Sequence, residues 1–202
     1  MNLPLAVAAC VTAFALGATP TANLVAARWA GTDLRSVSTG TVSATNVFRV
    51  AGLLPFLLTS AVDVAKGVAA ALLVTPFDAP TIAVAAALTV IGHNWSPWLR
   101  GAGGRGVLTS VGFLLVAAPA GAALVLVAIV LGFLANATAP ACLIAQLTLT
   151  PLLTLLSGAE GTALGLALAA PMLLKRLAGN AIPPRSAGYR VYARRLLHDR
   201  DN

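Results

Sequence analysis

The sequence predicts an all-α polytopic membrane helix bundle with about seven transmembrane spans, its N-terminus outside the cell and its C-terminus inside. Of its 202 residues, 58% are hydrophobic and only 9% are charged, and the mean hydropathy is +0.89. Ordinary soluble domains carry far more charge. The apolar stretches are continuous rather than alternating, which favours helices over a β-barrel. These stretches are Leu3–Leu24, Val50–Val74, Thr81–Ile91, Val107–Leu134, Ala141–Leu156 and Thr162–Leu174.

The first stretch is interpreted as a retained helix, because residues 1–4 carry no cationic side chain and no clear signal-peptide cleavage site follows. Twelve of the thirteen Lys and Arg residues gather after the first stretch, in a Gly-rich loop and in the C-terminal tail, and Lys66 lies inside the second stretch. Cationic loops concentrate on the cytoplasmic side of membrane proteins, so all three regions are expected inside.

That orientation requires an even number of crossings between Arg105 and Lys175. The stretch Val107–Leu134 is therefore expected to form two spans, divided at Pro119-Ala120-Gly121. The first of them, about 12 residues, is short for a hydrocarbon core of about 30 Å. The outer turns then hold Asp78 and Glu160 and no cation.

Residues 1–178 are expected to form one transmembrane domain, and residues 179–202 a basic cytoplasmic tail. Within the tail, Tyr189–Leu197 suits a short amphipathic helix on anionic lipid headgroups. Equally, the basic tail could serve only to keep the C-terminus on the cytoplasmic side of the membrane. The two cysteines lie in apolar runs and the two histidines lie far apart in sequence, so neither a metal site nor a cofactor is expected.

The most informative motif is Gly92-His93-Asn94-Trp95, followed by Gly103-Gly104-Arg105-Gly106. Glycines let backbone N–H groups approach a phosphate, and arginine binds two of its oxygens at once. A polar loop between two spans must line a cavity or face water. We therefore predict a site for a phosphorylated compound at the membrane surface, with Arg105 facing water. His93 suits a general base or a substrate ligand, and equally a loop brace.

The predicted first inner loop, Asp33–Arg49, is crowded with hydroxyls and ends in Asn46 and Arg49. Hydroxyl and amide groups beside a guanidinium suit a phosphate or a glycerol group. Alternatively, Ser43 or Thr45 caps a helix there. The site hypothesis requires that Arg49 and Arg105 face one shared hollow.

Asp63 and Lys66 stand one helical turn apart inside the second predicted span, so they can pair. Charges at such depth usually face the bundle interior. A structural ion pair is favoured over a substrate ligand, and Gly67 indicates close helix packing beside it.

In this order, these motifs resemble the bacterial acyl-phosphate:glycerol-3-phosphate acyltransferases, the PlsY family. The segment Asp33–Arg49 resembles the family's first signature, and Asp63-x-x-Lys66-Gly67 a recurring Asp-x-x-Lys-Gly. The segment Gly92 to Val107 resembles its second signature, in which Gly-Gly-Lys-Gly is usual. The resemblance is good from about Gly17 to Leu134 and rests on hydropathy elsewhere. It also implies seven spans, as the cation argument does independently.

The resemblance implies that the 1-hydroxyl of glycerol 3-phosphate attacks the carbonyl of a fatty acyl phosphate, giving lysophosphatidic acid and phosphate in the first step of phospholipid synthesis. Such an anhydride is already activated, so positioning and charge neutralisation are enough. The catalytic residues that it implies are Thr39, Arg49, His93 and Arg105. The substrate-binding residues that it implies are Ser38, Gly40, Asn46, Asn94, Gly103, Gly104 and Gly106.

Three departures from the family pattern stand out. Thr39 replaces a serine, Arg105 replaces a lysine, and the His-x-x-Asn usual after the last span is missing. A catalytically silent relative that binds a lipid intermediate or scaffolds other membrane proteins is the alternative function. A transporter is disfavoured because the polar motifs are not repeated. The expected partners are acyl phosphate, glycerol 3-phosphate and membrane lipids, not nucleic acid, and the expected location is the bacterial inner membrane, crossed several times.

Overall fold

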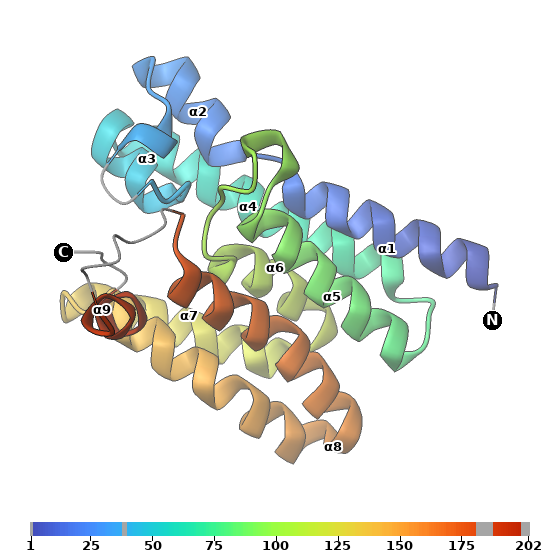
Figure 1. The fold of residues 1–202 in the computed structure, drawn as a ribbon. Helices are drawn as coiled ribbons and strands as arrows, with labels where there is room; N and C mark the ends of the chain where they lie inside the picture. The colour runs from blue at the N-terminus through green and yellow to red at the C-terminus, as the bar shows by residue number, and fades with distance from the viewer. Residues whose placement is uncertain (1, 38–39, 181–187, 199–202) are drawn as a thin grey trace.

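The computed structural model describes residues 2–37, 40–180 and 188–198. Within these ranges every regular element is a helix, which confirms the predicted all-α bundle (Figure 1). The α-helices are α1 (Leu3–Ala18), α2 (Thr21–Ala30), α3 (Ala44–Ala51), α4 (Leu53–Val74), α5 (Ala79–Asn94), α6 (Val107–Ala117), α7 (Pro119–Leu134), α8 (Thr138–Ala178) and α9 (Arg190–His198). Two short 3₁₀ helices are η1 (Leu34–Ser36) and η2 (Pro97–Leu99).

Three helical stretches of the described chain are long and apolar enough to cross a membrane, namely Leu3–Ala30, Leu53–Val74 and Thr138–Ala178. The helices α6 and α7 are apolar but shorter. They separate at Ala118, directly before Pro119, so the predicted division of the long apolar stretch is confirmed. With 11 residues, α6 is as short as the sequence indicated.

The longest helix, α8, makes two antiparallel passes rather than one (Figure 1). Gly158 has φ 58° and ψ −134°, outside the helical region, and the chain reverses there. Across the turn the hydroxyls of Thr154 and Thr162 lie 2.8 Å apart. The two predicted stretches Ala141–Leu156 and Thr162–Leu174 therefore form two separate helical passes.

The expected boundaries of the first two spans were wrong. The first helix ends at Ala18, and α2 begins at Thr21, because Pro20 lacks a backbone N–H and restricts the residue before it. Likewise, the helix expected from Val50 begins at Leu53. Gly52, with φ 86°, separates it from the short α3.

These breaks create a small cap beside the bundle, built from α2, η1, α3 and the loop after α5. The cap has its own apolar cluster, distinct from the main core of the bundle. The buried residues of this cluster are Ala22, Val25, Ala26, Leu34, Val42, Val47 and Leu99.

Inside the bundle, α4 and α6 pack backbone against backbone. A Cβ added at Gly67 would lie 2.1 Å from the carbonyl oxygen of Thr109, and one added at Gly112 would lie 2.0 Å from that of Val64. Small residues allow this approach, which is the usual way that membrane helices associate. The close packing that the sequence indicated at Gly67 is confirmed.

We expect Gly112→Ala to destabilise the protein by about 1–3 kcal/mol, because the added methyl must push α4 and α6 apart. The measurement is thermal unfolding of the purified protein in detergent. Leu115→Ala is the control, since Leu115 lies on the same helix and is 44% exposed. If both variants unfolded at the wild-type temperature, the two helices would not be in this close contact.

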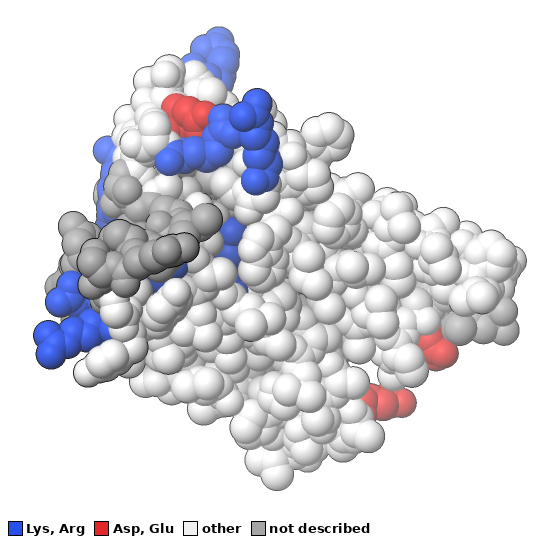
Figure 2. Space-filling view, in the orientation of Figure 1, with Lys and Arg blue, Asp and Glu red and all other residues white. Residues whose placement is uncertain are grey.

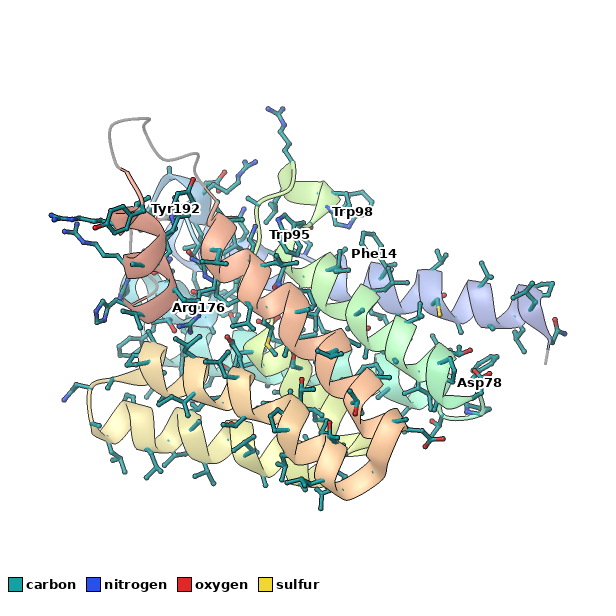
Figure 3. All side chains as sticks on the ribbon, turned by 60° about the horizontal axis from the view of Figure 1, so that its bottom comes forward. Phe14, Asp78, Trp95, Trp98, Arg176 and Tyr192 are labelled. Atoms are coloured by element: carbon teal, nitrogen blue, oxygen red, sulfur yellow. The ribbon has the colours of Figure 1, made fainter. Side chains whose placement is uncertain are left out.

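The charged side chains divide between the two ends of the bundle. Figure 2 shows the cations gathered at the end that carries α2, α3 and α9. Asp78 lies at the opposite end of α5 from Trp95 (Figure 3). The loops that the sequence placed on one side of the membrane therefore lie at one end of the molecule.

Candidate active site

Two polar loops meet at the cation-rich end of the bundle. One precedes α3 and contains Gly40, Thr41 and Val42, and the other runs from α5 to α6 and contains Gly103. They are joined directly, because the backbone N–H of Val42 donates to the carbonyl of Gly103 at 3.1 Å. The two motifs that the sequence singled out, about 60 residues apart, form one polar layer.

Asn180 fastens this layer, and the sequence analysis missed it. Its amide nitrogen donates to the carbonyl oxygens of Gly40 (3.0 Å) and Gly103 (2.9 Å). Its amide oxygen accepts from the N–H of Gly103 at 3.1 Å. One side chain just after α8 thus holds both loops. The only signal in the sequence was an asparagine following a basic helix end, which is common.

Arg105 is buried, so the expectation that it faces water was wrong. It is 8% exposed, and its guanidinium donates to the carbonyl of Lys175 (2.7 Å) and to the hydroxyl of Thr41 (3.3 Å). The carbonyls near a helix C-terminus have no partner inside the helix and attract cations. Arg105 therefore links the Gly-rich loop to the end of α8 and to the first loop.

Arg49 behaves differently, since it is exposed on α3. It donates to the side-chain oxygen of Asn46 at 3.1 Å, and Asn46 in turn donates to the carbonyl of Thr41 at 2.7 Å. Ser43 caps α3, because its hydroxyl accepts from the N–H of Asn46 at 3.4 Å. The cap uses the backbone N–H of Asn46, whereas the polar cluster uses its side chain. Helix capping by Ser43 and the polar cluster, which the sequence offered as alternatives, are therefore both present.

A small pocket lies beneath these loops, beside the break between α1 and α2. Its polar lining includes Asp63, Lys66 and His93, together with Gly103 and Gly104 of the Gly-rich loop. Neither Arg49 nor Arg105 lines it. The expectation that the two arginines face one shared hollow is therefore not met at this pocket. They are connected instead by hydrogen bonds through Thr41 and Asn46.

The predicted ion pair between Asp63 and Lys66 forms at 2.9 Å, and both side chains are almost fully buried. The Lys66 ammonium also donates to the carbonyl of Thr19, at the end of α1. Thr21, across the break in that region, lines the pocket, and its hydroxyl has no described partner. The ion pair therefore connects α4 to the end of α1 and also lines the pocket. The sequence had offered a structural ion pair and a substrate ligand as alternatives.

His93 contributes the only imidazole at the pocket. Its Nδ1 lies 3.3 Å from the hydroxyl of Thr109 and 3.9 Å from a carboxylate oxygen of Asp63. Its Nε2 lies against the backbone of Gly104, where an added Cβ would come within 2.2 Å of it. The ring is therefore held on its Nδ1 side, and Nε2 lies beside the Gly-rich loop.

The remaining candidates have separate places. Asn94 is fully buried and donates to the carbonyl of Pro171 at 2.9 Å, so it braces α5 against α8. Gly106, with φ 73°, is the N-cap residue directly before α6. Ser38 and Thr39 lie outside the described residues.

Tryptophans gather at membrane–water interfaces, where part of the ring stays exposed, and Trp95 and Trp98 lie at and just after the end of α5. Trp98 is 73% exposed, as that position requires. Trp95 is only half-buried and its ring lies 5.1 Å from the ammonium of Lys175, a cation–π contact. Lys175 also donates to the carbonyl of Gly101, so it braces the Gly-rich loop from the end of α8.

In the first loop, the carboxylate of Asp33 pairs with the guanidinium of Arg35. Arg35 donates to this carboxylate at 3.0 Å, and that hydrogen bond holds the pKa of the Asp33 carboxyl below its ordinary value. The pair is exposed, so its contribution to stability is small. Its negative charge is neutralised locally and does not oppose an anionic ligand nearby.

The model of the family described as glycerol-3-phosphate acyltransferase matches residues 7–181. The chain belongs to this family. Glycerol-3-phosphate acyltransferase 2 of Moorella thermoacetica is 44% identical over 112 residues, which is 55% of this chain and 58% of that protein. The glycerol-3-phosphate acyltransferase of Synechococcus sp. strain JA-3-3Ab is 46% identical over 106 residues, 52% of each chain. The chain thus spans little more than half the length of these members of the family.

The glycerol-3-phosphate acyltransferase fold extends over nearly the whole chain. The crystal structure of PlsY (YgiH), an integral membrane glycerol 3-phosphate acyltransferase in its glycerol 3-phosphate form, superposes with a TM-score of 0.79. The match covers 98% of this chain and 94% of that chain at 24% identity. The lysophosphatidic acid form gives a TM-score of 0.74 at 21% identity. The protein is therefore a multi-pass membrane protein with the PlsY fold, and the predicted helix bundle and family are confirmed.

Proposed function

We propose that the protein transfers a fatty acyl group from acyl phosphate to the 1-hydroxyl of glycerol 3-phosphate. The hydroxyl oxygen bonds to the acyl carbon, the bond from that carbon to the phosphate oxygen breaks, and lysophosphatidic acid and inorganic phosphate leave. The observation that carries this proposal is the union of both signature loops over a pocket that holds one ammonium and one imidazole. Family membership supports it independently.

Within this proposal, Lys66 neutralises phosphoryl oxygens, because its ammonium is the cation that lines the pocket. Gly103 and Gly104 line the pocket beside it, with their N–H groups already donating to Asn180 and to the carbonyl of His93. His93 accepts the proton of the attacking hydroxyl, since its Nδ1 side is already held by Thr109. No covalent nucleophile is needed, because an acyl phosphate is an already activated anhydride.

Arg49 and Asn46 bind a phosphate at the mouth of the site. Arg49 is exposed on α3 beside the joined loops, and its hydrogen bond to Asn46 orients its guanidinium. By the same family resemblance, Ser38, Thr39 and Gly40 contribute to that phosphate site, while Arg105 positions the Gly-rich loop rather than the substrate.

The proposed location is the bacterial inner membrane, with the N-terminus outside and the cation-rich end in the cytoplasm. The gathering of the cationic loops at one end supports this orientation, because positive residues stay on the cytoplasmic side. Soluble glycerol 3-phosphate then reaches the site from the cytoplasm, and the acyl phosphate reaches it from the membrane.

A catalytically silent relative that binds a lipid intermediate is the second candidate. The observation that favours it is the burial of Arg105. Its guanidinium donates hydrogen bonds to protein oxygens and does not line the pocket, which therefore has fewer cations for a substrate. Such a protein would bind acyl phosphate or glycerol 3-phosphate without turnover.

The test is phosphate release by the purified protein in lipid, supplied with acyl phosphate. We expect release that depends on glycerol 3-phosphate, and a loss of about tenfold in Arg49→Ala, the effect of one charge-assisted contact. Arg28→Ala is the matched control, because Arg28 is exposed on α2 at the same end of the molecule. Ligand binding without release would establish the silent relative, and neither binding nor release would overturn both candidates.

A further inference from the structure

Two buried arginines hold α9 against the end of α8. Arg195, 1% exposed, donates to the carbonyls of Leu177 (3.3 Å) and Ala178 (2.6 Å). In return, Arg176 of α8 donates to the carbonyl of Leu196 at 2.8 Å. Because the last carbonyls of a helix lack partners inside it, Arg195 both caps α8 and fixes α9 in place. Figure 3 shows Arg176 and Tyr192 in this region of the molecule.

Fixing Arg195 inward determines which residues of α9 face outward. Arg190, Arg194 and Leu197 follow the four- and three-residue spacing of one helix face, and all three are exposed. Leu197 is 48% exposed, and Tyr192, on the flank of the helix, is 47% exposed. The outer side of α9 therefore combines two guanidiniums with an aromatic and an apolar side chain.

The contacts of Arg176 also set the level of α9 along the bundle. The same guanidinium donates to the carbonyl of Ala139, at the beginning of α8, at 2.9 Å. Just before that point α7 ends in Phe133 and Leu134, which are 74% and 72% exposed on the outer surface of the bundle. The helix α9 thus lies where this apolar outer surface ends, at the predicted level of the lipid headgroups.

We propose that the outer side of α9 is a binding surface for anionic phospholipid headgroups. Arginine binds phosphate oxygens in pairs, and tyrosine and leucine beside it enter the boundary of the acyl chains. A second copy of the chain fits this surface poorly, because paired arginines would meet like charges. The proposal does not rest on the proposed enzymatic function, since the surface lies outside the pocket.

The experiment measures lipid binding to the full chain in detergent by native mass spectrometry, with dioleoyl phosphatidylglycerol and dioleoyl phosphatidylcholine as probes. Each arginine near an anionic surface is worth about fivefold in affinity. The double variant Arg190→Gln, Arg194→Gln should therefore lose about tenfold or more in phosphatidylglycerol affinity and keep its phosphatidylcholine affinity. The double variant Arg28→Gln, Arg100→Gln makes the same charge change at two exposed positions of the same end and should stay within about twofold.

Three outcomes would overturn the proposal. Equal losses in both double variants would assign the preference to the general positive field of this end of the molecule. An unchanged preference in the α9 variant would show that its arginines do not bind headgroups. A dimer mass in the wild type that disappears in the α9 variant would make a second copy the occupant. All variants change exposed residues, so each is expected to fold.

Discussion

Asn180→Ala should lower acyl transfer about a hundredfold, because a small misplacement of positioning loops costs that much. The wild-type side chain makes three hydrogen bonds of 2.9–3.1 Å to Gly40 and Gly103. Their loss should also cost about 3 kcal/mol of unfolding free energy at about 1 kcal/mol each. Since Asn180 does not line the described pocket, we treat it as a positioning residue that acts through the two loops. The measurements are acyl-phosphate turnover and thermal unfolding.

The variant Asn180→Asp tests whether the hydrogen bonds of Asn180 or only the size of its side chain matter for activity. A carboxylate retains the acceptor for the N–H of Gly103, but it faces the carbonyl oxygens of Gly40 and Gly103 without a donor. It should therefore fail to restore activity, although its size is nearly unchanged. Amide hydrogen exchange should rise in residues 101–106 and not in α1. Asn2→Ala, at an exposed position without a side-chain cap bond, is the control.

Unaltered exchange in the Gly-rich loop of Asn180→Ala would contradict this role, whatever the activity showed. Lost activity with normal exchange would instead place Asn180 in direct contact with a substrate. An equal loss of stability throughout the bundle would make it a general structural residue.

Arg105→Ala should cost about 3 kcal/mol of stability as well as nearly all turnover. Its guanidinium donates to the carbonyl of Lys175 and to the hydroxyl of Thr41, and charged hydrogen bonds of this kind are worth about 1.5–3 kcal/mol each. Arg105→Lys should recover part of the stability only, because one ammonium cannot span both acceptors in the geometry of a guanidinium. Thermal unfolding and turnover are measured on the same preparations.

Arg100→Ala is the matched control for this series. Arg100 lies in the same loop and carries the same charge, but it is exposed, so its removal should change stability by less than about 0.5 kcal/mol. Should Arg105→Ala unfold at the wild-type temperature while losing turnover, Arg105 would act on the substrate as the sequence first indicated, and not as a brace.

Much of the fold follows from the sequence because bilayer physics leaves few alternatives. Continuous apolar stretches become helices, and the stretch that contains Pro119 divides directly before that residue. The breaks at Pro20 and Gly52 were missed for a related reason. The apolar faces of α2 and α3 form the core of the small cap, so these helices also contain apolar residues. A hydropathy average over a whole stretch therefore does not reveal the backbone breaks beside them.

The site was predicted as a set of motifs, and its internal arrangement was not. The sequence singled out Lys66, His93 and Gly103, which do meet at one pocket. It placed Arg105 in water because a Gly-rich loop between spans normally faces water. The acceptor that buries this arginine, the carbonyl of Lys175, is 70 residues away, and no local pattern indicates it.

Composition and motif order, taken alone, determined a membrane helix bundle and its family. These features follow from the constraints of the bilayer and from residues that lie close together in the sequence, so they can be recognised without the tertiary structure. Only the tertiary structure decided that Asn180 fastens two loops, that Arg105 is a brace and that Arg195 sets the outer face of α9. Each of these results comes from hydrogen bonds to backbone carbonyls of another element, and every residue type offers the same carbonyl.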